Sequence, residues 1–167
     1  MYTLKEIGEI CGASLEGQGH QKISSFLTDS RDLVDPNAVL FIAIKTDKNN
    51  GHFYIASLIE KGVRSFLITK DELDTAQFPE ASFLISADPL SSLQKLAAHH
   101  RRQFNIPVIG ITGSNGKTVV KEWLYQILKE DHRICRSPKS YNSQIGVPLS
   151  ILRLDPSHNL GIFEAGI

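Results

Sequence analysis

Residues 106–128 read IPVIGITGSNGKTVVKEWLYQIL, and this stretch decides the fold. It opens with an apolar and largely β-branched run, residues 106–111, which predicts a buried strand. A glycine-rich loop, residues 112–118, follows. A strand, a glycine-rich loop and a helix in this order predict a phosphate-binding loop. The apolar spacing after the loop predicts that helix, with one face made of Val120, Trp123, Leu124, Ile127 and Leu128.

The loop carries the residue types that a polyphosphate needs. Glycines allow successive backbone N–H groups to converge on an anion, and the helix N-terminus adds a partial positive charge. Lys117 is expected to reach the terminal phosphates, and the Thr118 hydroxyl is expected to bind Mg²⁺. The predicted nucleotide-binding residues are Gly113, Ser114, Asn115, Gly116, Lys117, Thr118 and Val119.

One position departs from the general motif. Ile111 stands five residues before Gly116, where the motif usually has a glycine, and the glycine lies at Gly113 instead. The alternative is an ordinary strand–turn–helix junction with a surface lysine. The flanking strand and helix favour phosphate binding, because they supply the structural context that the motif requires.

The composition is that of an ordinary globular protein of 167 residues, enough for one domain or two small ones. Lys and Arg number 18, as do Asp and Glu, so the net charge does not indicate a nucleic-acid partner. The longest apolar run, residues 39–44, is too short to cross a membrane, and the N-terminus has no apolar signal core. Cys11 and Cys135 lack metal-ligand spacing and are expected to be buried free thiols. We therefore expect a soluble cytoplasmic protein without nucleic-acid or membrane partners.

The first half of the chain predicts a small α/β domain, residues 1–85. Residues 3–6, TLKE, have the pattern of a capping box and begin a helix that ends near Gly12. A helix at residues 53–61 is predicted between parallel strands joined by a right-handed crossover. The predicted strands lie at residues 39–44, 63–69 and 82–85.

The stretch Thr28-Asp29-Ser30-Arg31 places hydroxyls, a carboxylate and a guanidinium together. Asp and Ser commonly form local turns through side-chain-to-backbone hydrogen bonds. Arg31 could instead bind a phosphate or a carboxylate through two parallel hydrogen bonds. The residues alone favour neither alternative.

The second domain, residues 86–167, is expected to be the first part of a parallel-sheet ATPase domain. A helix from Asp88 to Gln103 opens it, and its basic end, residues 99–102, is expected to be solvated. Strands are predicted at residues 133–136 and 160–163, with one or two helical turns at residues 149–154.

Two polar features follow these predicted strands. Residues 137–144, which include Asn142, form a loop of the kind that lines the ligand crevice in doubly wound sheets. Glu164 ends the last strand, where a second Mg²⁺ contact is expected after a phosphate loop, and the alternative is a surface glutamate. So small a sheet would leave an edge and apolar helix faces uncovered, so we expect the chain to self-associate or to be poorly ordered near its end.

Together these segments resemble one family, the Mur ligases of peptidoglycan synthesis. Residues 112–118 are similar to the family's nucleotide loop, including its short glycine spacing. Residues 28–31 followed by residues 39–43 resemble the opening of the UDP-substrate domain. Residues 50–53, NGHF, resemble a stretch in which the family has aspartate in place of the asparagine.

The later segments point in the same direction. Residues 164–166, EAG, are similar to the family's metal-binding glutamate segment. Lys121-Glu122 and residues 142–148 are most similar to the members that join D-Ala-D-Ala to UDP-N-acetylmuramoyl-tripeptide.

The resemblance implies an ATP-dependent ligase that uses ATP and Mg²⁺ and forms the new amide bond through an acyl phosphate. Its substrates would be UDP-N-acetylmuramoyl-tripeptide and D-Ala-D-Ala. Lys117 and Asn142 would be catalytic, the first at the transferring phosphoryl group and the second near the phosphates or the acyl group. Thr118 and Glu164 would hold Mg²⁺. The UDP-sugar end of the substrate would contact Thr28, Asp29, Ser30 and Arg31.

The resemblance also implies that the chain is the N-terminal part of a three-domain enzyme and is inactive alone. The tripeptide-forming Mur ligase and a folate polyglutamate synthetase are alternatives on the same scaffold, and the Asp-Ser-Arg stretch argues against the folate enzyme. A non-catalytic module that binds nucleotide or UDP-sugar and a phosphate-loop kinase are further alternatives. The short glycine spacing argues against the kinase.

Overall fold

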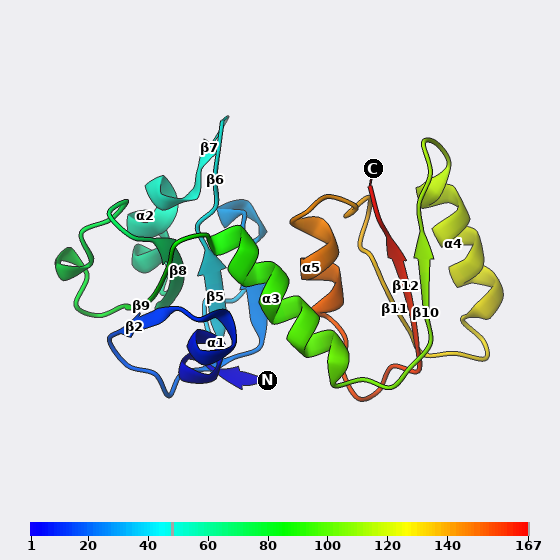
Figure 1. Cartoon of the computed structure of the whole chain (residues 1–167), viewed down its shortest axis with the longest axis horizontal. Helices are drawn as coiled ribbons and strands as arrows, with labels where there is room; N and C mark the ends of the chain where they lie inside the picture. Colours follow the sequence, from blue (N-terminus) through cyan, green and yellow to red (C-terminus); the bar gives the residue numbers. More distant parts are fainter. Residues whose placement is uncertain (48, 167) are drawn as a thin grey trace. The chain divides into compact units, whose positions relative to one another are not determined.

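The structure is a computed structural model that describes residues 1–47 and 49–166, so Lys48 and Ile167 lie outside the described residues. The chain forms two compact units, Met1–Lys95 and Leu96–Ile167 (Figure 1). The division falls inside helix α3, Pro89–Arg102, ten residues beyond the boundary that the sequence suggests. In the first half of α3, the Ser92 carbonyl oxygen accepts a hydrogen bond from the Cys11 thiol, and the Ser92 hydroxyl is hydrogen-bonded to the Ser86 hydroxyl. These hydrogen bonds connect that half of α3 to the rest of the first unit.

A five-stranded sheet forms the centre of the first unit. Its strand order is β2-β9-β8-β5-β4, with β2 antiparallel to β9 and the other neighbours parallel. The predicted parallel strands are confirmed, although β5 and β8 are each two residues shorter than expected. The bounds are Ser14–Glu16 for β2, Ser25–Leu27 for β4, Val39–Ile42 for β5, Ser65–Thr69 for β8 and Ser82–Ser86 for β9.

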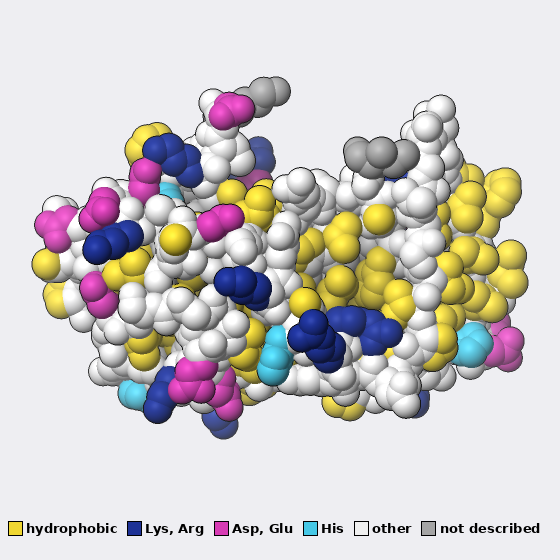
Figure 2. Space-filling view, in the orientation of Figure 1, with side chains coloured by type: hydrophobic (Ala, Val, Ile, Leu, Met, Phe, Trp, Pro, Cys, Tyr) yellow, Lys and Arg dark blue, Asp and Glu magenta, His cyan; other side chains and the backbone are white. Residues whose placement is uncertain are grey.

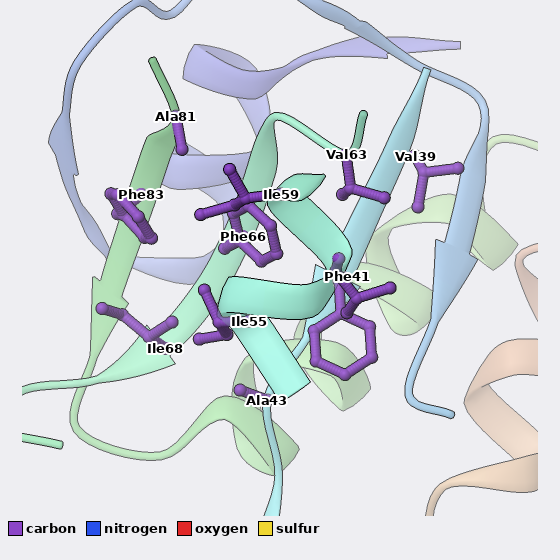
Figure 3. Close-up of a cluster of buried hydrophobic side chains, with 11 residues drawn as sticks. Val39, Phe41, Ala43, Ile55, Ile59, Val63, Phe66, Ile68, Ala81 and Phe83 are labelled. Carbon is purple, nitrogen blue, oxygen red and sulfur yellow. The ribbon is translucent and has the colours of Figure 1, made fainter. Parts of the chain in front are cut away.

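Three phenylalanines in register form the centre of the hydrophobic core between this sheet and helix α2, Ile55–Glu60 (Figure 3). Phe41, Phe66 and Phe83 pair across β5, β8 and β9, and each is almost completely buried. The Phe66 and Phe83 rings stack with centroids 5.5 Å apart, and Phe41 meets Phe66 edge-on at 6.3 Å. Aromatic pairs across neighbouring strands stabilise the pairing of those strands as well as the core.

Helix α1, Leu4–Cys11, has both halves of the predicted capping box. The Thr3 hydroxyl accepts a hydrogen bond from the Glu6 N–H at 3.2 Å, and the Glu6 carboxylate accepts one from the Thr3 N–H at 2.7 Å. The helix ends at Gly12, whose φ of 68° is readily available to glycine. The smaller elements of this unit are β1 (Tyr2–Thr3), β3 (Lys22–Ile23), β6 (Lys45–Thr46), β7 (Asn49–Asn50), and the 3₁₀ turns η1 (Ser30–Asp32), η2 (Gly51–Tyr54) and η3 (Thr75–Gln77).

The second unit holds a three-stranded parallel sheet of order β10-β12-β11, together with helices α4 and α5. Helix α5 begins at Gly146, three residues before the predicted helical turns, with Pro148 inside its first turn. Proline is tolerated there because N–H groups in the first turn have no partner within the helix. The bounds are Val108–Ile111 for β10, Lys117–Leu128 for α4, Ile134–Arg136 for β11, Gly146–Ile151 for α5 and Leu160–Glu164 for β12.

The predicted apolar face of α4 is largely exposed, in line with the expectation that so small a sheet leaves apolar helix faces uncovered. Trp123 is 67% exposed and Ile127 is 70% exposed, whereas Lys121, on the next face of the helix, is completely buried. Hydrophobic side chains accordingly gather on the surface over α4 (Figure 2). Strand β10 was predicted to be buried, yet it lies at the edge of the sheet of the described residues and leaves Val108 exposed.

The basic end of α3 is not the simple solvated turn that the sequence predicts. His100 is buried, with Nε2 2.9 Å from the Leu154 carbonyl oxygen. Arg101 donates hydrogen bonds to the carbonyl oxygens of Phe104 and Ile106. These contacts anchor the end of the helix to the second unit.

The two cysteines are buried free thiols, as predicted. Burial raises the pKa of each thiol to about 11, so both are protonated at neutral pH. Among the described residues, no helix has the length and apolar character that crossing a membrane requires.

Candidate functional site

The glycine-rich loop between β10 and α4 has the backbone that phosphate binding requires. Gly113 has a φ of 141° and Gly116 a φ of 76°, conformations that other residues rarely adopt. A Cβ at either position would meet nothing within 4 Å, so both glycines border open space. The backbone N–H groups of Ser114, Asn115 and Gly116 donate to no acceptor among the described residues. An anion could therefore accept from these N–H groups at the N-terminus of α4.

Two side chains at the start of α4 are directed at neighbouring parts of the site. The Lys117 ammonium donates to the Gly113 carbonyl oxygen within the loop. The Thr118 hydroxyl donates to Glu164 Oε2 at 3.0 Å. The Val119 side chain is about half exposed. The structure thus brings the loop and Glu164 together, although they are far apart in the sequence.

Glu164 is completely buried at the end of β12, which is the central strand of its sheet, so the alternative of a surface glutamate is wrong. Its backbone N–H donates to the Ser137 hydroxyl at 3.1 Å. The carboxylate Oε1 lies 2.8 Å from the Lys121 ammonium, but this contact is not a well-aligned hydrogen bond. The pair is therefore held by electrostatic attraction more than by a directional hydrogen bond.

The donor set suits Mg²⁺ in part. Thr118 and Glu164 supply two hard oxygen atoms, and Mg²⁺ usually takes its other ligands from phosphates and water. No group of three or more His, Cys, Asp or Glu side chains in the described part of the chain could hold a metal by itself. At such a site, phosphates and water would supply the remaining ligands.

The loop with Asn142 is attached closely to the end of β12. The Gly166 N–H donates to the Asn142 carbonyl oxygen at 2.7 Å, and a Cβ on Gly166 would lie only 2.7 Å from that oxygen. On the other side of the loop, a Cβ on Gly146 would lie 2.9 Å from the Tyr141 backbone. These close approaches require glycine and bring Asn142 to the same edge of the sheet as Glu164.

Lys121 lies in this site, although the sequence did not identify it as a site residue. Its ammonium is completely buried and pairs with Glu164 and with Glu122 Oε1 at 3.3 Å. It also donates to the carbonyl oxygens of Ser137, at 2.9 Å, and Lys139. The only sequence signal was a Lys-Glu pair after the loop, which by itself suggests a solvated helix turn.

In the first unit, the four predicted substrate residues line one pocket of about 250 Å³. Asp29 caps the turn η1 through the Arg31 N–H, and its carboxylate binds the Arg31 guanidinium at 2.6 to 3.1 Å. This pairing holds the pKa of Asp29 at about 2. The local turn that the sequence suggested is thus observed, and it leaves the pocket open. Asn49 and Tyr54 also line this pocket, and nothing in the sequence singled them out.

Asn50, beside this pocket, makes hydrogen bonds that suit an asparagine. Asn50 Oδ1 lies 2.7 Å from His52 Nδ1, while Asn50 Nδ2 donates to the Glu72 carboxylate at 3.0 Å. An aspartate would put a second carboxylate against Glu72. His52 Nε2 accepts from the Thr69 N–H, and burial lowers the pKa of His52, so the folded unit holds the neutral imidazole.

Comparison with known proteins agrees with this geometry. Residues 111–167 match the family profile of the Mur ligase middle domain. The chain is 34% identical over 165 residues to a UDP-N-acetylmuramoyl-tripeptide–D-alanyl-D-alanine ligase from Synechocystis, and this match covers 98% of the chain and 36% of the relative. The similarity to Mur ligases thus extends over nearly the whole chain, and the middle-domain match covers its last third. The chain spans about a third of the length of the curated relatives it matches.

Solved structures point to the same members of the Mur ligase family. A MurF structure from Acinetobacter baumannii has a TM-score of 0.86 and 28% identity and covers 99% of this chain, which spans 36% of that one. A MurF ligase from Thermotoga maritima, solved in complex with ADP, has a TM-score of 0.69 and 25% identity over 87% of this chain and 32% of its own.

Proposed function

We propose that this chain belongs to a ligase that joins D-Ala-D-Ala to UDP-N-acetylmuramoyl-tripeptide in the cytoplasm, where ATP is available. The observation that supports this most is the hydrogen bond between Thr118 and the buried Glu164 beside the glycine-rich loop, in a chain that resembles MurF over nearly its whole length. The activity is that of the whole protein, and the chain contributes the phosphate loop and the pocket at Thr28–Arg31.

In this proposal, ATP supplies the phosphoryl group that converts the tripeptide carboxylate into an acyl phosphate, which the amine of D-Ala-D-Ala attacks with release of phosphate. The loop N–H groups bind the polyphosphate, and Lys117 leaves the Gly113 carbonyl to stabilise charge on the transferring group. Thr118 and Glu164 hold Mg²⁺. Asn142, which is attached to the end of β12, contacts the reacting groups.

The pocket of the first unit is proposed to hold the UDP-sugar end of the substrate. Arg31 offers an exposed guanidinium, and Thr28 and Ser30 offer hydroxyls beside it. A distant anchor of this kind positions the reacting carboxylate and so lowers the entropic cost of the transfer. In this proposal the first unit binds the UDP-sugar end of the substrate, and the second unit carries the residues that act on the phosphates.

Phosphate release from ATP by the full-length protein should require both UDP-N-acetylmuramoyl-tripeptide and D-Ala-D-Ala, because the acyl phosphate forms only on the bound substrate and is consumed by the amine. A coupled phosphate assay measures this. Release with the UDP-dipeptide and a diamino acid instead would support the tripeptide-forming ligase. Binding of both ligands without any release would support the non-catalytic module.

Lys117→Ala should weaken ADP binding to the 167-residue chain by at least about tenfold, because a charge-assisted contact to phosphate is lost. Isothermal titration calorimetry measures the affinity. Lys129→Ala, at the other end of the same helix, is the matched control and should bind as the wild type does. Equal affinities for the wild type and Lys117→Ala would exclude this loop as the nucleotide site.

Arg31→Ala should weaken binding of a UDP-sugar by about tenfold, because a charged hydrogen-bond donor to the diphosphate is removed. Calorimetry or chemical-shift perturbation measures the binding. Lys61→Ala removes an exposed cation from the same unit, outside the pocket, and should have no effect. If both variants bind alike, the pocket does not recognise the diphosphate.

We also propose that the isolated chain self-associates through the exposed apolar face of α4 and the edge strand β10. This surface comprises Val108 of β10 and Val119, Val120, Trp123 and Ile127 of α4. Exposed apolar patches and open strand edges both favour association. Light scattering should show a mass that rises with concentration, and Trp123→Glu combined with Ile127→Glu should abolish the rise. A wild-type chain that stays monomeric at high concentration would contradict the proposal.

A further inference from the structure

Lys121 occupies an unusual position for a lysine. Its side chain is completely buried, and four oxygen atoms surround the ammonium. They come from α4, from the loop after β11 and from the end of β12, and belong to Glu122, Ser137, Lys139 and Glu164. A buried ammonium is costly unless it is paired and hydrogen-bonded, as it is here.

We propose that Lys121 is a built-in counter-cation for Glu164, which keeps a free divalent metal out of the site and so makes metal binding depend on nucleotide. This inference rests on the proposed nucleotide function. It makes Lys121 a positioning residue that acts through Glu164.

The charges around Lys121 support this role. Glu164 is paired with Lys121, and Glu122 is shared between Lys121 and Arg136, so two acids face two bases. Arg136 also lies over the Tyr125 ring at 4.0 Å, which helps to keep it in place. A divalent metal ion without nucleotide would meet the Glu164 carboxylate already neutralised by Lys121, and the nearby ammonium would repel it. The phosphates of a nucleotide supply the negative charge that this balanced cluster lacks.

The geometry also decides which oxygen of Glu164 can reach a metal. Oε1 faces the Lys121 ammonium at 2.8 Å, whereas Oε2 faces the Thr118 hydroxyl at 3.0 Å. Lys121 therefore directs Oε2 toward the loop as the single ligand atom.

The same ammonium supports the polar loop. Lys139 has a φ of 50°, a strained conformation for a residue with a side chain, and its carbonyl oxygen accepts from Lys121. Strain of this kind persists where surrounding contacts enforce it. Lys121 thus couples the loop that carries Asn142 to the position of Glu164.

The test is thermal unfolding of the nucleotide-free chain, followed by circular dichroism with and without millimolar Mg²⁺. Wild type should unfold at the same temperature in both conditions. Lys121→Met leaves a buried carboxylate without a cation and should lower the melting temperature by about 10 °C or more. Mg²⁺ should restore much of this loss, because the variant has a vacant cation position beside two oxygen ligands.

Two further variants make the result specific. Lys121→Met combined with Glu164→Gln removes both charges and should recover stability without responding to Mg²⁺. Lys129→Met, at the exposed end of α4, should behave like the wild type. If Lys121→Met does not fold without metal, its refolding in Mg²⁺, compared with that of the double variant, is the same test.

Three outcomes would overturn the inference: an equal Mg²⁺ shift in wild type and Lys121→Met, a Mg²⁺ response that survives Glu164→Gln, or no loss of stability in Lys121→Met. None of these measurements contains nucleotide. A failure of the counter-cation role would therefore leave nucleotide binding untouched, and absence of nucleotide binding to the wild type would not change the Mg²⁺ results.

Discussion

The ion pair between Lys121 and Glu164 is the interaction on which the candidate site depends. A carboxylate at the end of a central strand is removed from water, and its charge would be costly without a cation beside it. The pair joins the helix after the glycine-rich loop to β12, and the ammonium adds bonds to the loop between β11 and α5. One buried charge contact thus holds three separate segments in one arrangement.

Parallel strands explain why the remaining residues meet. In the second unit, the glycine-rich loop, the Asn142 loop and Glu164 all lie at the carboxyl ends of β10, β11 and β12. The first unit has a related arrangement, because Thr28–Arg31 follow β4, and Asn49 lies in the β6–β7 hairpin that comes after β5, the parallel neighbour of β4. Parallel pairing sends successive carboxyl ends to the same edge, so segments far apart in the sequence become neighbours.

Helix α4 shows that apolar spacing can identify a helix without identifying the face that is buried. Its apolar spacing identified a helix, but the inward face is centred on Lys121, with Leu124 and Leu128 only partly buried and Trp123 exposed. Periodicity says which residues share a face, whereas the sheet beneath decides which face is turned inward. Here Glu164, at the end of the neighbouring strand, attracts a lysine that no hydrophobic pattern would place inside. The burial of His100 arises in the same way, from Leu154 more than fifty residues away.

The sequence by itself determined the local features of this protein: the glycine-rich loop, the capping box of α1, most strands of the parallel sheets, the buried thiols and the family resemblance. Each of these depends on residues within a few positions of one another or on side-chain volume alone. Only the tertiary structure decided that Glu164 is buried, that Lys121 neutralises it, and that Asn49 and Tyr54 share a pocket with Thr28–Arg31. Those facts depend on contacts between distant segments, and the energy of a buried charge is set by the whole of its surroundings rather than by its neighbours in sequence.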